Sequence, residues 1–426
     1  MQRKAKSTRK NWDKLQIFSI CCCGLLVRAL RSFDVFCRVV DNFGDAAVCW
    51  RLARGLAAET GARTRLWIDD LGALHALAPQ LAAGRPQQSF DGVEICHWTA
   101  DADFGLPADV VVDAFGGGIP DAYAEAMAGQ DSAPVRPLWI VLEYLSAEPW
   151  VAKHHGLPSP HPRLPLERYF FFPGFAAGTG GLLREAGLGA RREKFLRDPR
   201  KREAFWRDAG FAPPAPGARL ISLFGYENPA AAELLEAWAS GEQAVVAAVP
   251  RSRLRGDVAV YLGIDAGTEN ATEVSDQVIR RGSLEVRFLP FLAQDRYDEL
   301  LWAADWNFVR GEDSFVRAQW AERPFVWHAY PQKEGAHVTK LEAFLEVYCR
   351  GLAPAASQTL AAPLAALWRG WNGAAPLPAG AMARAWSALA PQGAALEQHA
   401  CAWAAEAGKS GDLVRNLTKF CAERLE

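Results

Sequence analysis

Residues 33–70 read FDVFCRVVDNFGDAAVCWRLARGLAAETGARTRLWIDD, and this stretch decides the fold. Phe33–Val40 is rich in β-branched and aromatic residues, as is typical of a buried strand. Ala46–Glu59 then carries apolar residues at helical spacing and stops at Gly61, and Arg63–Asp70 predicts a second strand. The order strand, helix, strand predicts a parallel βαβ unit, from which Rossmann-like domains are built.

Two series of such elements follow one another along the chain. Val110–Phe115 and Leu138–Leu142 extend the first series, and the charged, then Pro-rich residues 185–217 predict a connector. The strands of the second series are predicted at Arg219–Tyr226, Ala244–Val249, Glu285–Leu289 and within Trp306–His328, where strand, turn, helix and strand succeed one another. The Ala-rich tail from residue 352 predicts helices that close with Asp412–Leu425.

A chain of 426 residues is too long for one ordinary hydrophobic core. We therefore expect an α/β protein with two Rossmann-like domains, residues 33–215 and 216–409, which face each other across a cleft as in the GT-B architecture. The C-terminal helix, residues 410–426, is expected to join the first domain. Ligands of open parallel sheets bind outside the carboxyl ends of the strands. The loops 41–45 and 310–314 both follow such ends.

Charge is spread unevenly over the chain. Residues 1–31 carry a net charge of +7 and residues 32–426 a net charge of −9. An acidic body is a poor match for nucleic acid, whose nonspecific binding depends on neutralising phosphates, and suits a basic substrate better. The nine cysteines form no CxxC pair, which indicates reduced thiols in a cytoplasmic protein.

Residues 1–32 are predicted to be an extension outside the folded domains. Basic residues precede the apolar run Leu15–Val27, which has the order of a secretory signal. The run is too short to span a bilayer, and Arg28 and Arg31 follow where small cleavage-site residues would be expected. A dispensable extension is favoured, a signal stays open as the alternative, and no membrane partner is expected.

The loop DNFGD, residues 41–45, opens the first helix. Capping alone would explain Asp45 as an N-cap and Asp41 as a turn residue. Both carboxylates together with Asn42 and Gly44, at the end of the first strand, also suit a base or a cation site. The two interpretations stay open at this point.

The loop RGEDS, residues 310–314, opens a helix in the second series. Its glycine turn offers free N–H groups at a helix N-terminus, which suit a diphosphate. Arg310 can neutralise a departing phosphate, and Glu312 can accept hydrogen bonds from sugar hydroxyls. Asp313 and Ser314 are natural N-caps, an explanation that leaves Arg310 and Glu312 without a role.

Other motifs predict no cofactor and no metal. The glycines of residues 174–185 lack GxGxxG spacing after a clear strand, and no P-loop or GxSxG motif is present. His154 and His155 are adjacent, and no HExxH-like spacing accompanies them.

A series of segments resembles one known family, the EarP arginine rhamnosyltransferases that modify bacterial elongation factor P. The matching segments include FDVFCRVVDNFGDAAVCWRLARGLA, LEYLSAEPWV, SLFGYEN, FLPFLAQDRYDELLW and RGEDSFVRAQWAERPFVWHAYPQ, in order between residue 33 and about residue 345. The resemblance implies a GT-B fold, dTDP-β-L-rhamnose as donor, elongation factor P as acceptor, and inverting transfer without a metal. Residues 1–32 depart from the family pattern.

Residue by residue, the resemblance implies the following roles. The catalytic residues are Asp41, Asp45 (the general base) and Glu312. The donor contacts are Arg310, Asp313 and Ser314 at the diphosphate, Phe291 and Gln294 at the nucleobase, and Tyr226 and Tyr330. The acceptor side is expected to include Asn42 and Gly44 and, from their position at a strand end rather than from the resemblance, Glu143, Ser146 and Glu148. The alternatives are a GT-B enzyme acting on a glycan or lipid, a nucleotide-sugar-binding protein without catalysis and, least favoured, a Rossmann dehydrogenase.

Overall fold

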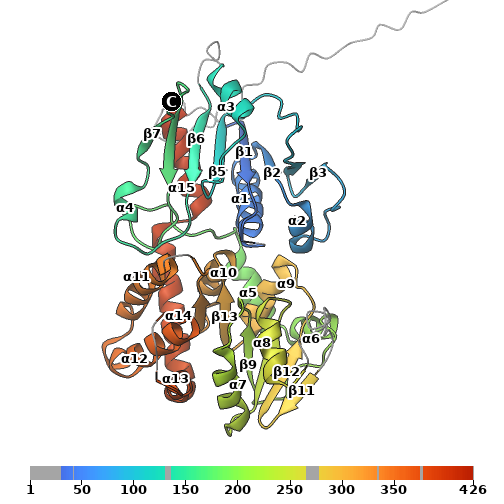
Figure 1. The fold of residues 1–426 in the computed structure, drawn as a ribbon, viewed down its shortest axis with the longest axis vertical. Coiled ribbons are helices and arrows are strands. Elements are labelled where there is room, and N and C mark those ends of the chain that lie inside the picture. Colours follow the sequence, from blue (N-terminus) through green and yellow to red (C-terminus); the bar gives the residue numbers. More distant parts are fainter. Residues whose placement is uncertain are drawn as a thin grey trace, which may run out of the picture.

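The computed structural model describes residues 30–41, 43–129, 136–264, 278–332, 335–374 and 378–425. They build two α/β halves, each around its own β-sheet, which lie one above the other in Figure 1. The predicted class, two Rossmann-like units in the GT-B arrangement, is confirmed. Most of the predicted extension, residues 1–29, lies outside the described residues.

The first sheet has eight strands in the order β3-β4-β2-β1-β5-β6-β8-β7, and only the edge strands β3 and β7 run antiparallel to their neighbours. These strands are β1 Ser32–Cys37, β2 Arg63–Ile68, β3 Gln87–Phe90, β4 Val93–His97, β5 Val110–Ala114, β6 Leu138–Leu142, β7 Pro158–Pro160 and β8 Glu167–Phe171. The helices of this half are α1 Gly44–Thr60, α2 Leu71–Leu77, α3 Asp121–Ala128 and α4 Val151–His154. Phe33 and Val35 pack in one apolar cluster and Phe36 in another, so β1 is buried on both faces.

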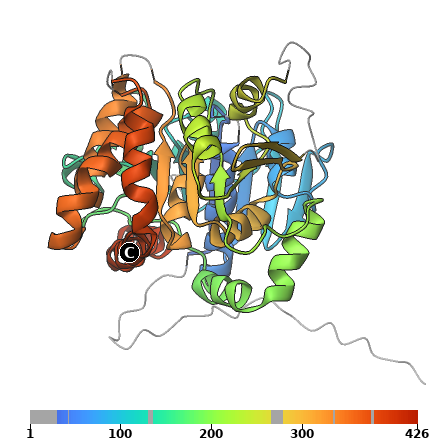
Figure 2. The same cartoon turned by 90° about the horizontal axis from the view of Figure 1, so that it is seen from below.

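The second sheet has six strands in the order β11-β12-β10-β9-β13-β14, with β11 antiparallel at the edge. Its strands are β9 Arg219–Leu223, β10 Val245–Val249, β11 Val278–Arg281, β12 Leu284–Phe288, β13 Trp306–Arg310 and β14 Phe325–His328. Its helices are α7 Ala231–Ser240, α8 Leu254–Tyr261, α9 Gln294–Ala303, α10 Asp313–Ala321, α11 Ala336–Arg350, α12 Pro354–Trp371, α13 Ala381–Leu389 and α14 Gly393–Ala407. Figure 2 shows the orange and red helices of the tail gathered along one side of this sheet.

Two segments connect the halves. The predicted connector contains two helices, α5 Leu188–Arg197 and α6 Pro199–Asp208, and both pack against α9 of the second half. The last helix, α15 Leu413–Leu425, packs against α1 and β6 of the first half (Figure 1). The domain limits at residues 215 and 409 themselves stay a prediction.

Several predicted ends differ from the observed ones. The first strand was expected to reach Val40, but it ends at Cys37 because carboxylates take the next backbone donors. The N–H of Val39 donates to Asp69 Oδ1 at 2.9 Å and that of Val40 to Asp45 Oδ2 at 2.9 Å. The chain therefore leaves the sheet early and forms the loop that carries Asp41.

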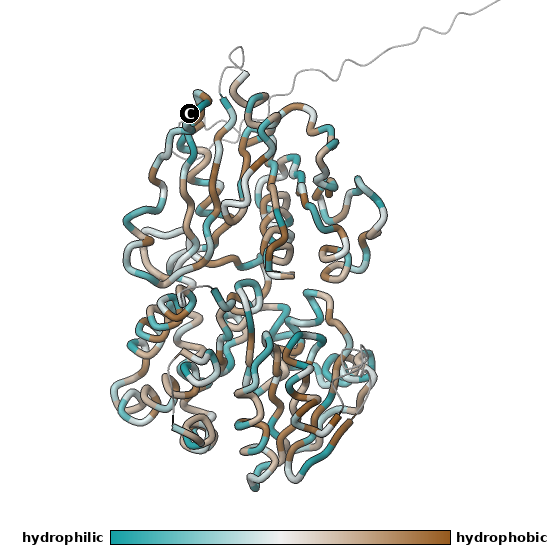
Figure 3. Tube along the Cα trace, viewed as in Figure 1, coloured by the Kyte–Doolittle hydropathy of each residue, from teal (hydrophilic) through white to brown (hydrophobic). Residues whose placement is uncertain are grey.

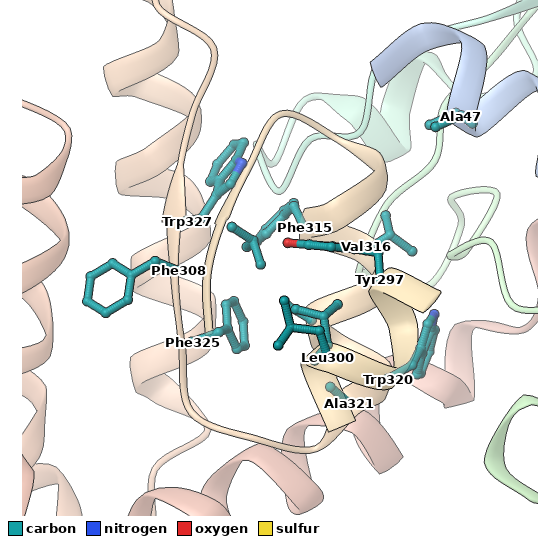
Figure 4. Packing of buried hydrophobic residues seen from close by; sticks show 14 of the residues in the cluster. Ala47, Tyr297, Leu300, Phe308, Phe315, Val316, Trp320, Ala321, Phe325 and Trp327 are labelled. Atoms are coloured by element: carbon teal, nitrogen blue, oxygen red, sulfur yellow. The ribbon is translucent and has the colours of Figure 1, made fainter. Parts of the chain in front are cut away.

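Apolar residues gather along the strands of both sheets, as the brown segments in Figure 3 show. Beneath α10 the core is densely aromatic. Phe315 stacks on Trp327 with their ring centroids 4.1 Å apart, and Phe325 and Trp320 pack in the same cluster (Figure 4). This packing fixes α10, and with it the loop that opens the helix.

Candidate active site

The carboxyl ends of the two sheets face each other, and two small cavities lie between them. One, of about 60 Å³, is lined by Asp41, Phe291, Gln294, Arg310 and Ser314 among others. The other, of about 150 Å³, is lined by Asp45, Tyr144, Glu312, Tyr330 and Lys340 among others. Each is smaller than the ~300–1,000 Å³ of typical ligand pockets, so a nucleotide sugar requires side chains or halves to move apart.

Asp41 is held by two side chains from the opposite half. The Tyr226 hydroxyl donates to Asp41 Oδ2 at 2.6 Å, and Arg310 Nη1 lies 3.4 Å from Asp41 Oδ1. Burial raises the pKa of Asp41, and the charge of Arg310 opposes that rise. The sequence interpretation aimed Arg310 at a diphosphate, whereas here its guanidinium faces this carboxylate.

The two glycines beside Asp41 leave room for its carboxylate. A Cβ on Gly44 would lie 2.8 Å from Asp41 Oδ2, and one on Gly311 would lie 2.8 Å from the same oxygen. Gly311 also has a φ of +61°, which other residues rarely adopt. The backbones of both loops therefore approach the carboxylate more closely than any other residue would permit.

Asp45 does not cap α1. The N-cap residue is Phe43, without a side-chain hydrogen bond, and Asp45 lies in the first turn of the helix. Its Oδ2 accepts the N–H groups of Val40 and Asp41, both at 2.9 Å. The Tyr144 hydroxyl donates to Oδ1 at 3.3 Å, and Asp45 lines the larger cavity. The backbone of the loop therefore fixes Oδ2, while Oδ1 has the longer bond to Tyr144.

Glu312 precedes α10 and lines the larger cavity. Its Oε2 accepts the N–H of Leu145 from the first half at 3.0 Å. Burial raises the pKa of Glu312 to about 8, against the opposing charge of Lys340, and the nearby Asp45 adds to the rise. The carboxyl is therefore mostly protonated at neutral pH, and can donate a hydrogen bond as well as accept one.

Arg310 ends β13, and Ser314 fixes the backbone around it. The Ser314 hydroxyl accepts the N–H of Arg310 at 3.0 Å and donates to the Arg310 carbonyl. The prediction that Asp313 or Ser314 caps α10 is wrong, because the N-cap residue is Glu312 and its side chain makes no capping bond. The guanidinium of Arg310 stacks over Phe224 and Tyr226, 4.8 and 4.7 Å from the ring centroids.

Phe291 and Gln294 line the same small cavity as Arg310. Gln294 Nε2 donates to the Ala47 carbonyl of α1 at 2.9 Å, while its buried Oε1 has no hydrogen-bond partner among the described residues. Phe291 packs against Phe43 with centroids 4.9 Å apart. An apolar ring beside an unpaired amide oxygen suits a planar base that offers an N–H.

The residues expected on the acceptor side are more scattered. Ser146 is buried and its hydroxyl donates to Glu148 Oε2 at 2.9 Å, while Glu148 lines a separate groove beside α11 and α12. Burial raises the pKa of Glu143, against the charge of Lys340. Asn42 lies outside the described residues. Among the described residues of the acceptor-side set, Gly44 alone lines the two cavities.

Sequence reasoning missed three residues at the site. Tyr144 bonds Asp45 and stacks on Phe115, and Lys340 lies over the Tyr144 ring, 5.4 Å from its centroid. Arg51 contacts Asp313. Tyr144 stands inside the LEYLSAE segment between two residues that were named, and Arg51 is a charge on the buried face of α1. The sequence therefore contained a signal for Tyr144 and a signal for Arg51.

The described residues contain no group of three or more His, Cys, Asp or Glu side chains placed to hold a metal ion. Within the same part of the chain, every helix is too short or too polar to span a bilayer.

Two Rossmann-like halves with carboxylates and an arginine-lined helix N-terminus between them define a GT-B glycosyltransferase. Residues 33–422 match the family model described as elongation factor P rhamnosyltransferase EarP. The chain belongs to this family.

Similar proteins agree with this assignment. The protein-arginine rhamnosyltransferase of Pseudomonas putida is 47% identical over 91% of this chain and 98% of its own length. That of Pseudomonas aeruginosa is 45% identical over 93% of this chain and 100% of its own length. A solved structure that concerns EarP-mediated arginine glycosylation of elongation factor P is 35% identical and covers 91% of this chain and 98% of its own, with a TM-score of 0.62. The chain is therefore a rhamnosyltransferase.

Proposed function

We propose that this enzyme transfers L-rhamnose from dTDP-β-L-rhamnose to an arginine of elongation factor P, with inversion and without a metal or other cofactor, in the cytoplasm. The observation that carries the proposal is the meeting of three carboxyl groups, Asp41, Asp45 and Glu312, with Arg310 at one cleft. Acidic groups suit a guanidinium acceptor, and a cation suits a diphosphate leaving group. The names of the relatives support the rhamnosyl donor and the arginine acceptor.

The donor is assigned to the second half. Arg310 and the free N–H groups at the start of α10 suit the two phosphates. Phe291 and the unpaired Oε1 of Gln294 suit thymine, which offers a ring N–H. A carboxylate repels a diphosphate, so we assign Asp313 its part through its backbone N–H rather than its side chain.

Binding of the acceptor arginine is assigned to Asp41 and Asp45. A guanidinium is a poor nucleophile, because its pKa is near ~13.8 and its lone pairs are delocalised. Carboxylates that bind it by two parallel hydrogen bonds localise electron density on one nitrogen. This nitrogen forms its bond to the anomeric carbon as the bond to the diphosphate oxygen breaks on the opposite face, and Asp45 takes the proton. The substituted guanidinium keeps its positive charge, and dTDP leaves with the bonding electrons.

Arg310 and the start of α10 stabilise the charge that grows on the diphosphate, as oriented donors do in other transferases. Glu312, protonated at neutral pH, donates a hydrogen bond to a sugar hydroxyl at the cleft. A glycan or lipid acceptor is the alternative, in which Asp45 would deprotonate a hydroxyl instead.

The test is the intact mass of elongation factor P after incubation with the enzyme and dTDP-β-L-rhamnose. We expect a mass increase of one deoxyhexose on an arginine, and an α-linked product in its NMR spectrum. Asp45→Asn is the matched control and should give no increase. Modification of a glycan panel but not of elongation factor P would support the alternative, and tight donor binding without turnover would support a binding protein.

A further inference from the structure

Arg51 brings a full charge into the apolar side of α1. Its side chain is completely buried, and it reaches across the junction to the second half. Arg51 Nε donates to Asp313 Oδ1 at 2.9 Å, and Nη2 lies 3.3 Å from Asp298 Oδ1. Nη1 donates to Glu185 Oε1 at 2.5 Å.

A second arginine completes the cluster. Arg317 of α10 donates to both oxygens of Asp298, at 2.8 and 2.7 Å, and to Glu185 Oε2 at 2.5 Å. Although burial alone would raise the pKa of Glu185, Arg51 and Arg317 hold it far below its usual value. Two arginines and three carboxylates thus join α1, the connector, α9 and α10.

Such a cluster is better suited to fixing geometry than to adding stability. Buried ion pairs often stabilise a fold no more than well-packed apolar residues would, because both charges lose their water. Hydrogen bonds between charged groups are directional, however, and hold a carboxylate oxygen at a defined position, which apolar contacts do not do. Arg51 does this for Asp313, the first residue of α10, next to the turn that Arg310, Gly311 and Glu312 form.

We propose that Arg51 is a positioning residue: from the acceptor half, it holds the donor loop, residues 310–314, in its productive place by binding Asp313. The proposal rests on the function proposed above. The Leu145 N–H, bound to Glu312, is a second contact between this loop and the first half. Arg51 also neutralises a carboxylate that lies beside the diphosphate site.

The first test is Arg51→Lys, compared with Arg54→Lys as its matched control. Arg54 lies one helical turn further along α1 and pairs with Asp91 of its own half at 3.1 Å. Lysine keeps the charge of Arg51 but cannot bind three carboxylates in a plane. We expect kcat/KM for dTDP-rhamnose to fall about tenfold or more, since ~1 Å misplacements have cost ~100-fold. The KM for elongation factor P should change less than about twofold, and Arg54→Lys should match the wild type.

A double-mutant cycle with Asp313→Asn separates positioning from a general loss of structure. If Arg51 acts through Asp313, Asp313→Asn should lower donor kcat/KM in the wild type, but by less than about twofold in the Arg51→Lys background. Calorimetry with dTDP measures binding of the leaving group directly, on samples whose folded fraction is set by circular dichroism. If Arg51→Lys fails to fold, the variants Asp313→Asn and Asp313→Glu are compared instead. Asp313→Glu, which keeps a carboxylate for Arg51 to bind, should then bind dTDP more tightly than Asp313→Asn.

Three results would overturn the proposal: unchanged donor kinetics in folded Arg51→Lys, equal losses toward donor and acceptor, or additive effects in the cycle. In the replacement series, equal dTDP affinities of Asp313→Asn and Asp313→Glu would do the same. Failure of the proposed function gives a different result, because the wild type itself would then leave elongation factor P unmodified. The same variant comparison would in that case be made by dTDP calorimetry alone.

Discussion

Replacing Glu312 with glutamine should stabilise the protein against unfolding at pH 8. In the folded protein, the pKa of about 8 keeps the proton on Glu312, whereas in the unfolded chain the group ionises near its usual value of 4.5. The folded state therefore binds more protons than the unfolded state between these values. The free energy of unfolding must then fall as pH rises from about 4.5 to about 8.

The size of this effect follows from the same two values. The pKa of Glu312 is about 8 in the folded protein and 4.5 in the unfolded chain. At ~1.4 kcal/mol per pH unit, the free energy of unfolding can therefore fall by at most about 5 kcal/mol as the pH rises. For domains of roughly 200 residues, at about 2 °C per kcal/mol, the limit corresponds to about 10 °C in Tm. Glutamine cannot ionise, and its oxygen can still accept the Leu145 N–H. The unfolding free energy of the variant should therefore not fall with pH in this way.

The assay is thermal unfolding of both proteins by circular dichroism from pH 5 to pH 8.5. The Tm values should nearly coincide at pH 5, and the variant should be several degrees more stable at pH 8.5. Glu423→Gln, which removes an exposed carboxylate of α15, is the control and should follow the wild type. A Tm difference that stays constant with pH, or that favours the wild type at pH 8.5, would refute the reasoning.

The remaining predictions concern the transfer reaction. Asp45→Asn should bind donor normally but lower turnover by ~100-fold or more, and initial rates within about tenfold of wild type would contradict its role as base. Arg310→Ala should lower kcat by ~100-fold or more with a smaller loss of donor affinity, and Arg310→Lys should recover only part of the lost kcat. Kinetics with donor and acceptor titrated separately show which of the two substrates each variant affects. EDTA should leave the initial rate unchanged because Arg310 and the start of α10 take the place of a cation, and restoration of a lost rate by Mg²⁺ or Mn²⁺ would contradict this.

The order of elements in the fold could be predicted because each element has a clear local pattern. β6 occupies Leu138–Leu142 as expected, since an uninterrupted apolar run has no other stable place. The helices of the connector were missed because charges dominate their sequence, although Leu188, Phe195 and Phe205 are buried on one face. The end of β1 was misplaced because it depends on Asp69, which is distant in sequence.

For the site, the sequence indicated the loops but not the contacts between them. Asp41 was placed in a loop that follows a strand and Arg310 at the end of a strand, and the structure agrees, yet no local pattern indicates that they face each other. The same holds for Glu312, whose partner Leu145 is 167 residues away. Contacts across the cleft depend on how the halves are docked, which short-range spacing does not encode.

The two passages between the halves have a mechanical consequence. They lie side by side, because Leu182 forms a bridge with Asp412 and the N–H of Arg184 donates to Asp412 Oδ2 at 3.0 Å. Because the two connecting segments are adjacent, we expect the halves to separate by rotation about this place in the fold. Opening then widens the cleft most at the points furthest from this hinge. If a protease cuts one of the two connecting segments, the other should still hold the halves together.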